Sequence, residues 1–197
     1  MYGEKKLIWS LCVVMGAGCA TNVKYEDATK VETTTADFGS TDLQQIANKM
    51  VDSLLSFPPM IQATTERSPV VFVETIKNKT LEHIDTESIT DSIRTKILRS
   101  GKFRFVDMTK VNAAKKQFEF QNESGIVNQA TAAAFGRHIG AEYMLYGNFA
   151  SIVKKSDTVK DVYYKFTLNL MELETGIIEW ADEKEIRKIS ERSWFGW

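Results

Sequence analysis

The feature that most constrains this chain lies near its start, where a short apolar run ends in small residues and a cysteine. Lys5 and Lys6 precede the run Leu7–Met15, and the motif Gly16–Cys19 follows it. This order is typical of a bacterial secretion signal that is cleaved immediately before a cysteine. Only the residues from Cys19 onward are then left to fold.

Two alternatives to a cleaved signal are open at this point. One is a transmembrane anchor, although the apolar run is far shorter than the roughly 20 residues that span a bilayer. The other is a buried first helix of a cytosolic protein. Gly16 also stands where leucine is usual in such signals, and Glu4 is unusual in a positively charged leader. We expect residues 1–18 to be a lipoprotein signal peptide, and Cys19 to carry N-palmitoyl and S-diacylglycerol groups.

Acyl chains on Cys19 tie the mature protein to a membrane. The next residue is Ala20. An aspartate at this place resembles a retention signal for the inner membrane, so alanine favours the outer membrane. We therefore expect a lipid-anchored protein that faces the periplasm.

The cysteine content limits how the mature chain is stabilised. The only other cysteine, Cys12, falls inside the leader, so the mature chain keeps Cys19 alone. With its sulfur acylated, no disulfide, cysteine metal site or cysteine nucleophile is available, and the fold must be held by packing. The net charge of −1 carries no nucleic-acid signature.

Composition divides the mature chain into a tether and one domain. Residues 19–40 are rich in Thr, Asp, Glu and Lys and contain few large apolar side chains. Such a segment buries too little apolar surface to offset its ordering entropy, so we expect a flexible tether. Residues 41–197 are enough for a single globular domain with a sizeable core.

Periodicity predicts the elements of that domain. Apolar residues at helical spacing predict a helix from residue 41 to 57, which Pro58 ends, and residues 70–73 are expected to form a buried strand. A polar loop is expected at 77–85, then a helix capped by Asp85 or Thr86 that stops at Gly101. A second strand at 103–106 and a helix that begins after Asp107 follow.

The second half of the domain is predicted to be richer in strands. After a polar loop at 121–125, a helix capped by Asn128 is expected to end at Gly140, followed by a strand at 143–153. Alternating apolar residues from Tyr164 to Leu170 predict a half-buried strand, and a hairpin turn at 174–176 leads to a last strand. The resulting prediction is an α+β fold (an α/β sandwich). Its mixed sheet ends in an antiparallel meander and is flanked by helices.

Catalytic motifs are missing from the sequence. The two histidines, His83 and His138, have no neighbouring Ser, Cys or carboxylate at a spacing that suggests a triad. No GxSxG, HExxH or phosphate-cradling glycine loop occurs. We therefore expect no catalytic residues, no metal ligands, no cofactor and no small-molecule substrate. An enzyme would need a cleft with perturbed titratable groups, which only a structure can reveal.

Two features point instead to a macromolecular partner. The stretch from Arg94 to Lys116 holds eight basic residues against Asp107 alone. It is interpreted either as a solvated helix face or as a docking patch for an acidic protein surface or an anionic envelope polymer. Loops on a rigid scaffold often carry recognition, which adds the 77–85 loop. The candidate partner-binding residues are Lys77, Lys79, Arg94, Lys96 and Arg99.

The aromatic stretch from Ser193 to Trp197 has two interpretations. Its three aromatic residues, Trp194, Phe195 and Trp197, either pack back on the domain or form an adhesive patch. An adhesive patch would contact a protein or, through the Trp rings, a membrane interface.

Several stretches resemble the LpoB family of outer-membrane lipoproteins, which activate a class A penicillin-binding protein. The resemblance covers about residues 41–190 and is carried by Asn78–Thr80, Ser100–Phe103, Ile139–Gly147 and Thr175–Trp180. It implies a TolB N-terminal-domain-like fold and a non-enzymatic role: the domain docks on the inner-membrane synthase and shifts it toward an active state. The partner would be a bifunctional peptidoglycan synthase, and the process would be cell-wall synthesis.

The tether departs from the pattern of that family, whose members carry a long, proline-rich tether. Here the tether has about 21 residues, which reach about 70 Å when fully extended, and it contains no proline. Related folds also occur in structural or secretion-accessory envelope lipoproteins of the TolB and curli type. Such a role, without synthase activation, is the alternative function.

Overall fold

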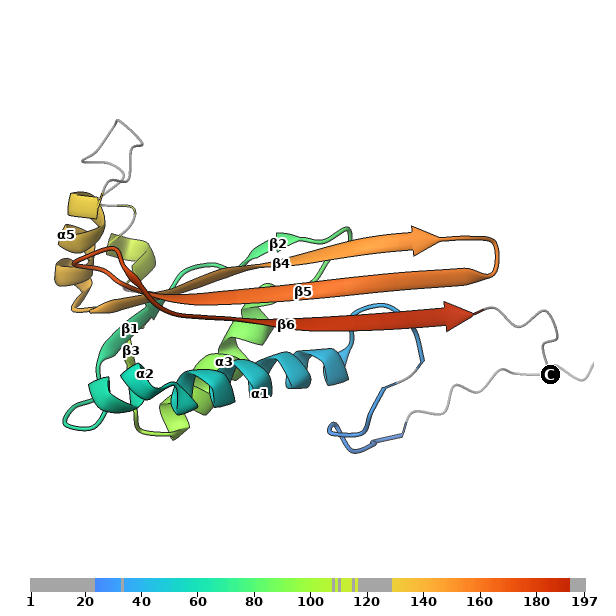
Figure 1. Cartoon of the computed structure of the whole chain (residues 1–197), viewed down its shortest axis with the longest axis horizontal. Coiled ribbons are helices and arrows are strands. Elements are labelled where there is room, and N and C mark those ends of the chain that lie inside the picture. The colour runs from blue at the N-terminus through green and yellow to red at the C-terminus, as the bar shows by residue number, and fades with distance from the viewer. Residues whose placement is uncertain are drawn as a thin grey trace, which may run out of the picture.

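One mixed sheet organises the protein, with helices on both of its faces (Figure 1). The computed structural model describes residues 24–107 except 33, residues 109, 111–114 and 116, and residues 129–191. The leader, Cys19, the 121–125 loop, the Asn128 cap and the aromatic stretch after Glu191 lie outside these ranges. The element order confirms the predicted α+β class.

Ten elements have defined bounds, and residues 109, 111–114 and 116 are helical as well. The helices are α1 (Ser40–Ser56), α2 (Pro58–Ala63), α3 (Thr86–Arg99) and α5 (Gln129–Ile139). The strands are β1 (Val70–Val73), β2 (Lys77–Lys79), β3 (Arg104–Phe105), β4 (Tyr143–Lys155), β5 (Val159–Glu172) and β6 (Ile178–Glu191).

The strands form a sheet in the order β3-β1-β4-β5-β6, and β2 pairs with the second half of β4. Strand β1 pairs in parallel with both β3 and β4, and β2 pairs in parallel with β4. Strands β4, β5 and β6 form the predicted antiparallel meander. Gly176, at φ +74°, closes the β5–β6 turn in the left-handed conformation that favours glycine.

Two short elements were not predicted. The loop expected at 77–85 begins with β2, which has three exposed residues and therefore no hydrophobic signal. The Asn78 side-chain amide holds the following turn by donating to the carbonyls of Glu82 and Ile84. Pro58 ends α1 as expected, but it also begins α2, where proline fits the first helical position.

The caps of the first half are those that the sequence suggests. The Asp85 side chain accepts hydrogen bonds from the backbone N–H groups of Glu87 and Ser88 and begins α3. Asp107 accepts from the N–H of Thr109 at 2.8 Å, as a cap of the next helix would. Gly101 follows α3 at φ +71°.

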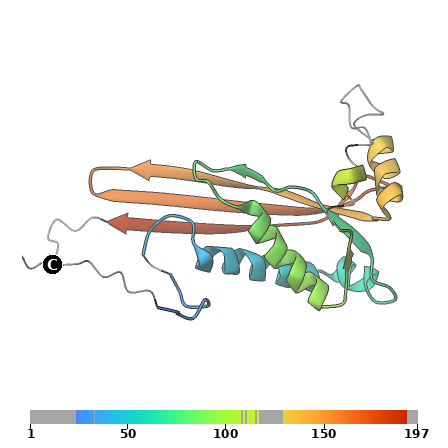
Figure 2. The same cartoon turned by 180° about the vertical axis from the view of Figure 1, so that it is seen from behind.

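The two faces of the sheet are covered unequally (Figures 1 and 2). Helices α1 and α3 pack on one face and bury the main core, which includes Ile46, Met50, Ile93, Phe149 and Tyr164. On the other face, α5 and residues near Val111 cover only one end of the sheet, around Phe72, Phe135, Met144 and Met171.

The main core also extends into the segment that was expected to be a tether. Ala36 is buried, and the ring of Phe38 lies 5.1 Å from Phe149 and 6.0 Å from Tyr164. The packed part of the chain therefore begins before residue 41, because two apolar residues in a polar segment suffice to fill the space beside the start of α1.

Candidate docking surfaces

Over most of its length the meander has one face that none of the described helices covers, since α5 and the residues near Val111 reach only its end at Met144 and Met171. Residues on each strand alternate between the helix side and this open face, and they are half-buried or exposed on the open face. The central residues of the open face are Tyr146, Asn148 and Ala150 of β4, Thr167 and Asn169 of β5, and Ala181 of β6. We call these six residues the central patch.

Two of the predicted partner-binding residues border this patch. In a parallel pair, residues in register share a face of the sheet. Lys77 is in register with Asn148, and Lys79 with Ala150. Both lysines are exposed, so they form a basic margin along one side of the central patch.

The opposite margin is acidic and is fixed by ion pairs. Lys165 lies 2.6 Å from Glu183 and 3.9 Å from Glu185, and the Tyr163 hydroxyl donates to Glu185 at 2.5 Å. The open face therefore runs from basic to uncharged to acidic across the sheet. Low charge and an aromatic residue at the centre, with charges at the rim, are features of protein–protein interfaces.

A further ion pair lies nearer the tip of the meander. Two guanidinium nitrogens of Arg187 bind the two Asp161 carboxylate oxygens at 2.6 and 3.0 Å. The hydrogen bond from Arg187 lowers the pKa of Asp161 below its ordinary value of 3.8.

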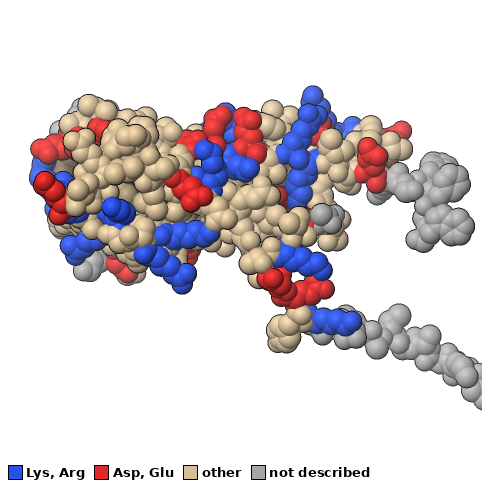
Figure 3. Space-filling model, turned by 60° about the horizontal axis from the view of Figure 1, so that its bottom comes forward, with Lys and Arg blue, Asp and Glu red and all other residues tan. Residues whose placement is uncertain are grey.

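The other three predicted residues, Arg94, Lys96 and Arg99, lie on α3 in the helix layer, on the opposite side of the sheet. Arg94 pairs with Asp91 at 2.6 Å, and the Lys96 ammonium contacts the Asn48 side chain. Seen from the helix side, basic groups form separate clusters with acidic groups between them (Figure 3). The five predicted residues are therefore divided between two surfaces.

A small cavity lies beside the end of β1. Its volume is about 150 Å³, and its lining includes Val73, Glu74, Glu87, Asp91 and Arg94. Within the described ranges, no group of three or more His, Cys, Asp or Glu side chains is arranged to hold a metal ion. None of the described helices has the length and apolar character needed to cross a bilayer.

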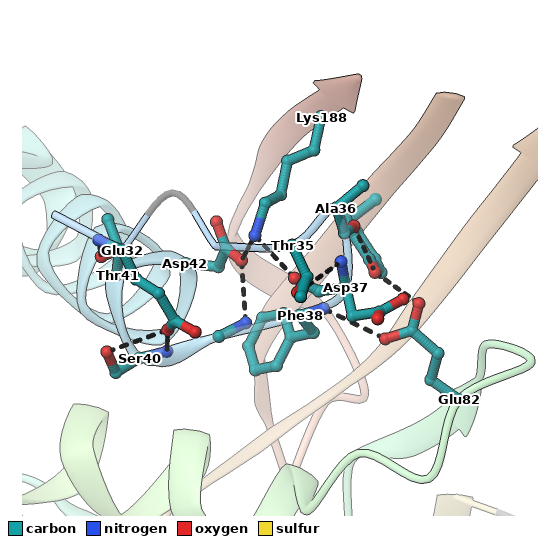
Figure 4. A network of polar contacts seen from close by, with 12 residues as sticks. Glu32, Thr35, Ala36, Asp37, Phe38, Ser40, Thr41, Asp42, Glu82 and Lys188 are labelled. Atoms are coloured by element: carbon teal, nitrogen blue, oxygen red, sulfur yellow. Dashed lines mark hydrogen bonds and ion pairs between the residues drawn. The ribbon is translucent and has the colours of Figure 1, made fainter. Parts of the chain in front are cut away.

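A dense polar network fastens the chain that precedes α1 (Figure 4). Glu82 accepts from the backbone N–H of Phe38 at 3.1 Å and from the Tyr164 hydroxyl at 2.5 Å. The Lys188 ammonium donates to the Asp37 carbonyl at 2.6 Å and to the Asp42 carboxylate at 2.9 Å. Segments far apart in the sequence are thus joined around Phe38.

Burial and the hydrogen bond to Glu82 both raise the pKa of Tyr164 well above its ordinary value. The phenol therefore stays protonated and keeps donating to Glu82 across the physiological range. No motif in the sequence predicted this network, because its members are separated by as many as 151 positions.

These features define a class of domain: an α+β module that presents an uncovered, low-charge sheet face. The sequence model of the family described as "Peptidoglycan-synthase activator LpoB" matches residues 42–186. The chain therefore belongs to the LpoB family, as the resemblance indicated.

Curated relatives are named penicillin-binding protein activator LpoB. The relative from Dickeya dadantii is 23% identical over 122 residues, which are 62% of this chain and 58% of the relative. The relative from Escherichia coli K12 is 25% identical over 112 residues, which are 57% and 49% of the two chains. The matches thus span only about half to three fifths of the relatives' length.

Solved structures confirm the fold. The LpoB C-terminal domain from Escherichia coli superposes with a TM-score of 0.54 at 21% identity, covering 74% of this chain and 98% of that domain. The domain from Salmonella enterica gives 0.51 at 20% identity, covering 75% and 99%.

Proposed function

We propose that this chain is an outer-membrane lipoprotein, anchored through Cys19, that binds and activates a class A penicillin-binding protein from the periplasmic side. The observation that carries the proposal is the family match over residues 42–186, together with relatives named as activators of penicillin-binding proteins. The leader motif Gly16–Cys19 and the following Ala20 support the anchor and the choice of membrane.

The central patch and its lysine margin form the docking surface in this proposal. A sheet face with Tyr146 in its low-charge patch and charges at its rim matches a protein interface better than the α3 surface does. There, Arg94 is already paired with Asp91. Rim charges such as Lys77 and Lys79 steer encounter with an acidic partner more than they strengthen binding.

Activation follows from preferential binding and requires no chemistry by this chain. A ligand shifts a two-state partner only by the difference between its affinities for the two states. The domain therefore has to bind the active conformation of the synthase more tightly than the inactive one. The role is regulatory rather than enzymatic, with no cofactor and no small-molecule substrate.

The test is a glycan-polymerisation assay with the cognate class A synthase and the mature chain in detergent solution. We expect the polymerisation rate to rise with added protein and to saturate. The mature chain with Cys19→Ala, which carries no acyl groups, is expected to activate equally well in detergent. An unchanged rate at saturating protein, with binding demonstrated, would rule the proposal out in favour of a structural role.

A further inference from the structure

One end of the molecule gathers the tip of the meander and both ends of the described chain. The β4–β5 turn, the end of β6 at Glu191 and the segment before α1 all lie at this end (Figure 1). Helices α2 and α5 lie at the opposite end. A lipid anchor at Cys19 therefore approaches the domain from the tip end.

The free length between the anchor and the domain is short. The Gln44 side chain donates to the Ala28 carbonyl at 2.7 Å, and the Glu32 N–H donates to Thr41 Oγ1 at 2.7 Å. These bonds hold the chain to the first turns of α1 from residue 28 onward. The chain from residue 19 to residue 27 therefore limits the distance between the anchor and the domain, because nine residues reach at most about 30 Å when fully extended.

This reach is shorter than the meander itself. Strand β4 has 13 residues, which span about 43 Å at ~3.3 Å each. The connection between Cys19 and the domain is thus shorter than the long strands of the meander, and it joins the domain at the tip end. A domain held in this way stays beside the membrane with its tip end toward the lipid.

The tip carries the side chains that such a contact requires. Ile152 and Ile189 are 59% and 58% exposed and lie on the open face beside Tyr163, which is the cross-strand partner of Ile152. Lys154 and Lys155 are exposed next to the turn. Lysines at an interface bury their alkyl stems and keep the ammonium among polar headgroups.

From this arrangement we propose that the tip of the meander is a membrane-contact surface, and that its partner is the lipid surface in which Cys19 is anchored. Ile152, Tyr163 and Ile189 enter the headgroup boundary, and Lys154 and Lys155 meet lipid phosphates. The inference deepens the proposed anchoring at Cys19 and rests on it. The central patch lies farther from the tip and stays available to a partner.

The experiment uses the mature chain with Cys19→Ala, so that acyl chains contribute nothing. Its partition onto vesicles of phosphatidylethanolamine and phosphatidylglycerol is measured by co-sedimentation. We expect the Cys19→Ala chain to partition onto these vesicles.

Two matched pairs of substitutions locate the contact. Ile152→Ser with Ile189→Ser is expected to lower partition by about tenfold or more, since two exposed aliphatic groups no longer enter the boundary. Ile61→Ser with Leu98→Ser removes side chains that are 46% and 53% exposed on α2 and α3, and partition should not change. Thermal unfolding of both variants checks that they fold.

Two outcomes would overturn the inference: no partition of the Cys19→Ala chain, or an equal loss for both pairs. Vesicles of phosphatidylcholine alone separate the lysine contribution from the apolar one, because Lys154→Glu with Lys155→Glu should weaken binding to the anionic vesicles only. A chain that activates the synthase in detergent but does not bind vesicles would contradict this inference and leave the proposed function in place. A chain that binds vesicles but does not activate the synthase would contradict the proposed function and leave this inference in place.

Discussion

The two faces of strand β5 differ in burial and in the kind of side chain that they carry. Its helix side carries Tyr164, Phe166, Leu168 and Leu170, all buried. Its open side carries Tyr163, Lys165, Thr167 and Asn169 in alternation, all half-buried. The same backbone thus holds the core with one set of side chains and presents a patterned surface with the other. Because the core side fixes the register, the open side is free to serve recognition.

The largest expected effect compares neighbours in β4 that face opposite ways. Phe149→Ala removes a fully buried ring that contacts Phe38, Tyr164 and Phe166, and should lower the free energy of unfolding by about 3–5 kcal/mol. Asn148→Ala, on the open face, should cost within about 0.5 kcal/mol. Denaturant unfolding measures both, and equal losses would mean that the open face is packed.

The next effect is on binding rather than on stability. Tyr146→Ala in the central patch is expected to weaken synthase binding by about 2 kcal/mol, or roughly thirtyfold in Kd, as loss of a central aromatic residue does. The control, Lys96→Ala with Arg99→Ala on α3, should change Kd by less than about twofold, as for charges outside an interface. Surface plasmon resonance with the detergent-solubilised synthase measures Kd for both variants. The reverse ranking would move the docking surface to the helix side.

A smaller effect contrasts two adjacent tyrosines that each bind a glutamate at 2.5 Å. Tyr164→Phe removes a donor from Glu82 inside the network around Phe38 and should cost about 1 kcal/mol or more. Tyr163→Phe leaves Glu185 to water and should cost about 0–0.5 kcal/mol. Similar losses would show that the two faces are equally desolvated.

The same pair predicts a pH dependence. Burial first, and then Glu82, raises the pKa of Tyr164 above its unfolded value of 10.0. The stability that this shift contributes is fully present below pH 10 and is lost as the pH rises toward the folded pKa. The advantage of the unsubstituted chain over Tyr164→Phe should therefore shrink only at strongly alkaline pH, in unfolding curves recorded across that range.

The smallest expected effect is the titration of Asp161. Replacing Arg187 by alanine removes the hydrogen bond that lowers the pKa of this carboxyl, so that pKa should rise toward 3.8. The stabilising effect of the pair is present above the unfolded value and is lost as the pH falls through the lower folded value. Carboxyl-carbon NMR reports the shift, and Lys165→Ala, which removes a partner of Glu183 instead, serves as the control.

Much of the fold could be predicted because its signals are local. The alternation from Tyr164 to Leu170 specified a half-buried strand, and Asp85 specified the start of α3. Strand β2 could not be predicted, since Lys77–Lys79 forms a strand only by pairing with β4. The hydrogen bonds that hold the segment around Phe38 could not be predicted either, because Glu82, Tyr164 and Lys188 come from distant parts of the chain.

The candidate site was predictable only in part, for the same reason. Lys77 and Lys79 were selected as residues of an exposed loop, whereas they border the central patch through their register with Asn148 and Ala150. The neutral residues at the centre carry no charge or motif that sequence reasoning could detect. Arg94, Lys96 and Arg99 attracted attention through charge density, which says nothing about the side of the sheet on which a helix packs.

The attachment of residue 28 to α1 has a consequence for how often partners meet. With the proposed anchor at Cys19, a docking module held within a shell of some tens of ångströms around that anchor experiences an effective concentration on the order of millimolar toward anything that enters the shell. Outside the shell that concentration is zero. Binding by such a protein therefore depends on the distance between its anchor and the partner, so a weak affinity is enough for a synthase whose docking domain comes within that distance.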